Sequence, residues 1–220
     1  MKKLVLCFIA VSLVIPAAAQ GIYSNGPTNG NTDAWTINFG FITSDRFTLG
    51  EFGTTLTGAQ FAMWLFPGDT LTSAELSITS QENGGTSYFN QTVDFTQSGC
   101  MANHYGFNVC NEITSFDGPF LNAGTYWINL QNASVPSGDP VYWDENSGGA
   151  QAWPPGASQN DVGSIPAESF TLLASCGAGD RNCQASSTVP EQSTAPEPGS
   201  ILLLASGVVG IAGWLRRSWA

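Results

Sequence analysis

The sequence has little positive charge. Its 220 residues include six Lys and Arg against seventeen Asp and Glu, so the net charge is −11 at pH 7. Between residues 20 and 195 only Arg46 and Arg181 are basic, whereas sixteen residues are acidic. Because Lys and Arg supply most contacts to phosphate backbones, this imbalance excludes nucleic acid as a partner.

The chain also lacks most of the groups on which catalysis depends. It has one histidine, His104, as the base that a serine nucleophile would need, and it has no Gly-x-Ser-x-Gly elbow. It contains neither a Gly-rich phosphate loop nor an Asp-x-Asp-x-Asp-Gly calcium loop. We therefore expect no enzyme activity and no cofactor. Calcium stays open as a ligand because the many carboxylates could supply oxygen atoms.

Long apolar runs occur only near the two ends. At the N-terminus, Lys2 and Lys3 precede an uncharged apolar run at 4–15 and small residues at 16–19. This order predicts a signal peptide, residues 1–19, that signal peptidase removes during export. The run is too short to cross a bilayer of about 30 Å as a helix. A buried N-terminal helix is the alternative interpretation.

Four cysteines would remain after this cleavage, namely Cys100, Cys110, Cys176 and Cys183. In an exported chain an even set predicts disulfides, for which three connectivities exist. Pairing of sequence neighbours is favoured because it closes two short loops. A zinc site at Cys100, His104 and Cys110 is the alternative, but structural zinc normally has four protein ligands.

Apolar residues alternate with polar ones along much of the chain. The segments with this period of two are 34–41, 76–79, 89–95, 105–109 and 126–130. Residues 61–66 are apolar on both faces and predict a central strand. Gly, Pro, Asn and Asp clusters separate the runs. We therefore predict an all-β domain at 20–183, an antiparallel β-sandwich of eight to ten strands with a jelly-roll-like arrangement.

One aromatic and acidic cluster is a candidate for glycan contact. Tyr142, Trp143 and Asp144, with Trp153 further on, could combine aromatic rings with polar hydrogen-bonding groups. Strand alternation would put Tyr142 and Asp144 on one face, and Val141 and Trp143 on the other. The alternative is that Trp143 belongs to the core and that residues 144–149 form a solvated turn.

Hydrolysis of a glycoside needs two suitably separated carboxylates. Asp144 and Glu145 are the best candidates beside the aromatic residues. Consecutive strand residues point to opposite faces, so these two make a poor acid/base pair.

The C-terminal segment has three parts. Residues 184–195 predict a flexible linker, since no residue there could anchor a core. Residues 201–215 are apolar, and with Ser200 they span roughly 24 Å as a helix, which is short for a permanent membrane span. Arg216 and Arg217 follow and predict a cytoplasmic tail with the domain outside.

These parts together resemble the PEP-CTERM sorting signal of Gram-negative bacteria, which exosortase enzymes process. The resemblance covers residues 196–220 and implies that 201–215 is a transient transmembrane helix. The implied sorting residues are Pro196, Glu197, Pro198, Arg216 and Arg217. The chain departs from the usual pattern in that residues 218–220 follow the arginines. An ordinary single-pass anchor is the alternative.

The resemblance implies export, tethering in the inner membrane during transit and cleavage near the motif. Release or attachment at the cell surface would follow, often where exopolysaccharide and biofilm are made. Segments 124–133, 140–149 and 164–170 are similar to a recurring PEP-CTERM passenger domain that has no assigned activity. We therefore expect a structural, non-catalytic protein of the cell surface or extracellular matrix. A carbohydrate-binding module and a glycoside hydrolase remain the alternatives.

Overall fold

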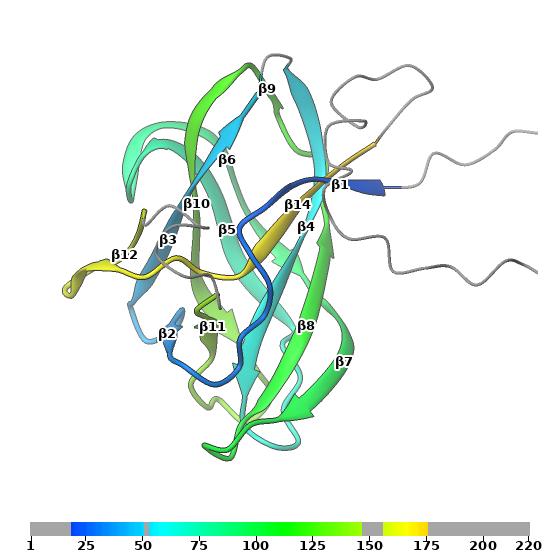
Figure 1. The fold of residues 1–220 in the computed structure, drawn as a ribbon, viewed down its shortest axis with the longest axis vertical. Helices are drawn as coiled ribbons and strands as arrows, with labels where there is room; N and C mark the ends of the chain where they lie inside the picture. The colour runs from blue at the N-terminus through cyan, green and yellow to red at the C-terminus, as the bar shows by residue number, and fades with distance from the viewer. Residues whose placement is uncertain (1–18, 51–52, 147–155, 176–220) are drawn as a thin grey trace, which may run out of the picture. The chain divides into compact units, whose positions relative to one another are not determined.

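The computed structural model describes residues 19–50, 53–146 and 156–175, and these residues form strands and loops without a helix. Figure 1 shows the strands in chain order. They are β1 (Ala19–Ser24), β2 (Ala34–Thr36), β3 (Ile42–Leu49), β4 (Thr54–Leu65), β5 (Ser73–Gln81), β6 (Gly84–Asp94), β7 (Thr96–Ala102), β8 (Asn108–Ser115), β9 (Phe120–Leu121), β10 (Gly124–Ser134), β11 (Tyr142–Asp144), β12 (Ala157–Gln159), β13 (Gly163–Ile165) and β14 (Phe170–Ser175).

Several predictions made from the sequence concern residues outside these ranges. They are the signal peptide up to residue 18, Trp153, Cys176, Cys183, the linker, the sorting residues and the transmembrane helix at 201–215. Within the described ranges, no helix is long and apolar enough to cross a membrane.

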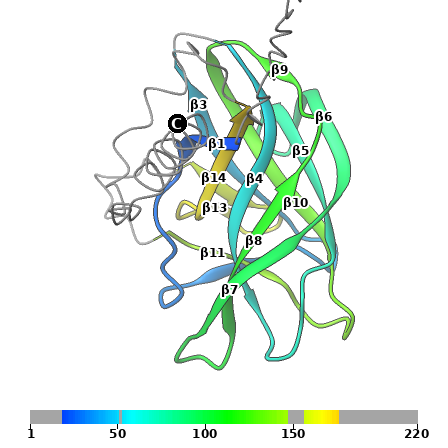
Figure 2. The ribbon, with the colours of Figure 1, turned by 90° about the vertical axis from the view of Figure 1, so that its right-hand side faces the viewer.

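The strands form two antiparallel sheets. The first has the order β1, β14, β4, β11 and β2, with β8 and β9 also pairing with β4, and β7 pairing with β8. The second has the order β13, β12, β3, β10, β5 and β6. Figure 2 shows β14, β4 and β8 side by side in the first sheet. The predicted all-β, antiparallel fold with two sheets is confirmed, but the predicted eight to ten strands are too few, because the described residues form fourteen.

Strand β4 is the centre of the first sheet. It pairs with β8 along one edge and with β14 and β11 along the other. Residues 61–65 are buried throughout, in agreement with an apolar run that has no polar face. This confirms the central strand predicted from the sequence.

The inner faces of the two sheets enclose one apolar core. Phe61, Trp143 and Phe170 enter it from the first sheet, and Phe47 enters it from the second. The rings of Phe61 and Trp143 meet edge to face with centroids 5.3 Å apart. Such a ring pair contributes about 0.5–1.5 kcal/mol beyond the burial of its apolar area.

Residues 34–41 do not form the single strand that their alternation predicts. Only β2 is extended, and it is followed by Phe39 and Gly40, whose φ angles are 57° and 88°. The backbone N–H of Phe41 donates to the carbonyl of Asn38 at 3.1 Å, which closes a turn. Phe39 is 65% exposed, so the alternation of apolar and polar residues at 34–41 does not correspond to a buried face at this position.

Residues 105–109 also differ from the prediction, because β8 begins only at Asn108. Gly106 has a φ of 88°, and the side-chain oxygen of Asn103 accepts the backbone N–H groups of Tyr105 and Phe107 at 3.0 Å. The amide of Asn103 therefore organises a loop at the end of the β7–β8 hairpin. This loop presents two aromatic side chains away from the sheet ladder.

Candidate functional site

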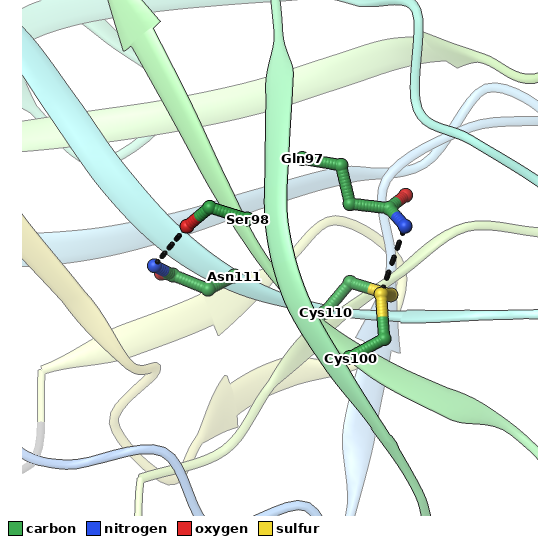
Figure 3. Close-up of a disulfide and its surroundings, with 5 residues drawn as sticks. All are labelled: Gln97, Ser98, Cys100, Cys110 and Asn111. Carbon is green, nitrogen blue, oxygen red and sulfur yellow. Dashed lines mark hydrogen bonds between the residues drawn. A yellow bond between two sulfur atoms is a disulfide. The ribbon is translucent and has the colours of Figure 1, made fainter.

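A disulfide joins Cys100 and Cys110, which face each other across β7 and β8. Figure 3 shows it beside Gln97, whose amide donates to the sulfur of Cys100 at 2.8 Å. The prediction that these neighbours pair is confirmed for this pair. Both sulfur atoms are bonded, so the zinc alternative at Cys100, His104 and Cys110 is wrong.

His104 lies in the loop that this disulfide closes. Its Nδ1 is 3.2 Å from the side-chain oxygen of Asn31, and its ring centroid is 3.7 Å from that of Tyr105. The histidine therefore contacts a loop and an aromatic ring.

The candidate glycan-contact residues of β11 occupy different environments. Tyr142 is half-buried and pairs with Trp64 of β4, so the two side chains share the outer face of the first sheet. Trp143 is fully buried in the core, and its indole N–H donates to the carbonyl of Ser169 at 2.9 Å. A glycan at the surface can reach Tyr142 but cannot reach Trp143.

Asp144 is also fully buried, although it lies on the same side of β11 as Tyr142. Its carboxylate accepts the backbone N–H groups of Asn29 and Gly30 at 2.7 and 2.8 Å. The indole N–H of Trp64 donates to it as well. Burial raises the pKa of Asp144, while these three donors lower it. Asp144 thus ties a loop to β4 and is not available to a ligand at the surface.

A surface hollow of about 460 Å³ lies on the outer face of the first sheet. Of the residues that line this hollow, only Tyr142 was predicted from the sequence as a glycan contact. The hollow is lined by Thr32, Asp33, Ala34, Trp64, Tyr105, Phe107 and Tyr142.

The aromatic residues of the hollow contact one another. The rings of Trp64 and Tyr105 are stacked, with centroids 5.6 Å apart, and the rings of Phe107 and Tyr142 meet edge to face at 5.5 Å. Because side chains alternate along β4 and Met63 faces the core, the sequence could have indicated that Trp64 points to the outer face. Nothing in the local sequence indicates that the loop of Tyr105 and Phe107 covers it.

Two neighbouring carboxyls are buried where β3 meets residues 167–169. Asp45 accepts the side-chain amide of Asn25 at 2.7 Å and the backbone N–H of Glu168 at 2.6 Å. Burial raises the pKa of Asp45 to about 7, although these donors oppose the change. Both side-chain oxygens of Glu168 are buried and have no hydrogen-bond partner among the described residues. Burial raises the pKa of Glu168 well above the usual range, and the nearby Asp45 raises it further.

Besides Asp144, Asp45 and Glu168, Glu112 of β8 is a fourth buried carboxyl in the described part of the chain. It lies opposite Phe61, which faces the core, and it is fully buried. Neither of its side-chain oxygens has a hydrogen-bond partner within the ranges that the structure describes, and burial alone raises the pKa of Glu112 to about 7. No three His, Cys, Asp or Glu side chains are grouped to hold a metal ion in the part of the chain that the structure describes.

Comparison with known proteins bears on the C-terminal segment. Residues 194–217 match the family described as the PEP-CTERM protein-sorting motif. The chain carries a PEP-CTERM sorting motif. This motif implies processing by an exosortase-type enzyme, and it fits a Gram-negative protein that is exported and anchored in the membrane during transit. It includes all five sorting residues predicted from the sequence. No curated protein matches the chain.

Proposed function

We propose that this PEP-CTERM chain is a protein of the cell surface or extracellular matrix with a structural, non-catalytic role associated with biofilm and exopolysaccharide. The observation that carries this proposal is the sorting motif at residues 194–217. Signal peptidase would remove residues 1–19, and an exosortase-type enzyme would then act near Pro196, Glu197 and Pro198. The β-sandwich is the part that would remain outside the cell.

The strand order supports a jelly roll. Strands β3, β10, β5 and β6 are neighbours in one sheet, and β1, β14, β4 and β8 are neighbours in the other. The chain crosses from β3 in the second sheet to β4 in the first and back to β5 in the second, whereas β5 with β6 and β7 with β8 form hairpins within one sheet. Distribution of eight strands between two sheets in this way is typical of jelly rolls, which often serve as capsid and lectin domains.

A non-catalytic role agrees with the environment of the best carboxyl pair. Asp144 is buried and accepts three hydrogen bonds from the protein, while Glu145 follows it directly after the end of β11. An inverting or retaining glycosidase needs two carboxyls that reach one glycosidic bond. Asp144 and Glu145 therefore favour a structural role over hydrolysis.

A carbohydrate-binding module is the second candidate function. The aromatic hollow favours it, because concave sites that combine aromatic walls with a few polar groups are typical of small-molecule binding. Binding and a structural role in a polysaccharide matrix are compatible.

Export and processing can be tested by pulse-labelling the full chain in a Gram-negative host with and without its exosortase gene. We expect a shorter product outside the inner membrane only when exosortase is present. Glu197→Ala should keep the longer form in the membrane, whereas Pro190→Ala, a control outside the motif, should be processed normally. Processing that is identical without exosortase would contradict the proposal, as would release of reducing ends from matrix polysaccharide by the purified chain.

A further inference from the structure

We infer that the hollow on the outer face of the first sheet is a binding site for neutral sugar rings of a polysaccharide. This inference deepens the proposed function and rests on it for the presence of polysaccharide around the protein. The volume of about 460 Å³ falls within the roughly 300–1,000 Å³ that is usual for small-molecule sites.

The aromatic rings of the hollow supply the apolar contact surface. Tyr105 is 53% exposed and lies stacked on Trp64, which is only 5% exposed, so Tyr105 covers Trp64. The ring of Tyr142 stands nearly perpendicular to that of Phe107, at 75°. Pyranose rings carry faces of C–H groups, and aromatic rings offer such faces a rigid apolar surface with a polar hydroxyl at the edge. Two aromatic walls at different angles therefore suit a ring-shaped ligand.

Polar groups at the rim can bind sugar hydroxyls. One carboxylate oxygen of Asp33 accepts the backbone N–H of Ala34 at 2.8 Å, while the other accepts no hydrogen bond from the described part of the chain. The hydroxyls of Tyr105 and Tyr142 also form no hydrogen bond within those residues. A tyrosine hydroxyl keeps its proton at neutral pH, and burial raises the pKa of Tyr142 further, so this hydroxyl can donate. The site thus offers both an acceptor and donors.

Charge decides between neutral and anionic sugars. No Lys or Arg lines the hollow, and Asp33 gives it a negative group. The whole chain has a net charge of −11, so its field repels anionic glycans. A neutral polysaccharide meets no such penalty.

The hollow is held in shape from beneath. Asp144 accepts the indole N–H of Trp64 and the backbone N–H groups of Asn29 and Gly30, so it fixes both the aromatic floor and the loop that leads to Asp33. A site whose shape exists before the ligand arrives loses less conformational entropy on binding. Asp144 is therefore a positioning residue and not a contact.

A second surface hollow, of about 350 Å³, lacks this combination. It is lined by Asn38, Phe39, residues 132–135, Gly138 and Asp139, and Phe39 is its only aromatic residue. Phe39 contacts no other aromatic ring there. The aromatic hollow is accordingly the better candidate for a stacked sugar.

The test is isothermal titration calorimetry of the full chain, purified in detergent, with cellohexaose, laminarihexaose and mannohexaose as neutral probes and oligogalacturonate as the anionic one. We expect at least one neutral probe to bind. Tyr105→Ala should weaken this binding by about tenfold or more, because it removes the exposed stacking surface. Tyr142→Phe, which keeps the ring and removes only the hydroxyl, should weaken it less. Tyr88→Ala, an exposed tyrosine on β6 of the other sheet, should leave it unchanged.

Circular dichroism of each variant checks that the fold is retained. The inference is overturned if no neutral probe binds, if Tyr105→Ala and Tyr142→Phe both bind as tightly as the unchanged chain, or if oligogalacturonate binds more tightly than every neutral probe. A chain that is processed by exosortase but binds none of the neutral probes contradicts only this inference. A chain that binds them but is processed without exosortase contradicts only the proposed route to the surface.

Discussion

Replacement of the core carboxyl Glu112 by glutamine should change how stability depends on pH. The folded protein raises the pKa of Glu112 from 4.5 to about 7, because burial disfavours the charged form. Between these values the folded chain keeps a proton that the unfolded chain has lost. The carboxyl therefore costs no stability below pH 4.5, and the cost grows as the pH rises until it is complete above about 7.

The size of the effect follows from the two pKa values. A difference of one pKa unit corresponds to about 1.4 kcal/mol, so the carboxyl of Glu112 should cost about 3 kcal/mol at pH 8 and under about 1 kcal/mol at pH 5. A glutamine side chain has nearly the same shape but no charge at either pH. Any cost of burying its amide is the same at both pH values, so the difference between the two pH values tests the raised pKa of Glu112.

The measurement is urea denaturation of the purified protein at pH 5 and pH 8, followed by circular dichroism. The free energy of unfolding of E112Q minus that of the unchanged chain should rise by about 2.5 kcal/mol from pH 5 to pH 8. Glu82→Gln, at an exposed position of the β5–β6 hairpin, should gain nothing. If E112Q differs from the unchanged chain by the same amount at both pH values, Glu112 is not a buried acid with a raised pKa.

Two further changes test the covalent and backbone restraints. Replacing Cys100 and Cys110 together by serine should lower the free energy of unfolding by about 2–3 kcal/mol, because a cross-link over a sequence separation of 10 restricts the unfolded chain. An equal midpoint of urea denaturation with and without the replacement would refute this. Gly68→Ala should cost about 1 kcal/mol because φ is 97° there, whereas Gly50→Ala, which also meets open space but has no positive φ, should be nearly neutral by the same measurement.

The alternation of side chains along β11 could be predicted from the sequence. Tyr142 and Trp143 point to opposite faces, as a period of two requires, and Trp143 belongs to the core. The solvent exposure of the outer face could not be predicted. Asp144 is covered because residues 29 and 30, which are 115 and 114 positions away in the sequence, donate to it. Contacts of that range leave no periodic signal.

A local limit explains the two strand predictions that were wrong. Alternation at 34–41 and 105–109 has the period of a strand, but Phe39 and Gly106 have positive φ angles that end extended structure. A glycine can occur in a strand or in a turn, so Gly106 alone did not distinguish them. A phenylalanine with positive φ is rare enough that no sequence rule would predict Phe39 there.

The disulfide and the aromatic hollow belong to one structural unit. Cys100 and Cys110 pair across β7 and β8, and the loop between them carries Tyr105 and Phe107 into the hollow. The hydrogen bonds that Asn103 accepts organise that loop. Strand β7, however, has only β8 as a neighbour among the described strands, and its residues are largely exposed. An exposed edge hairpin opens more readily than the core, so a covalent link near its loop end holds the loop against Trp64. Since disulfides persist outside the cytoplasm, export gives this surface loop a restraint that the apolar core does not provide.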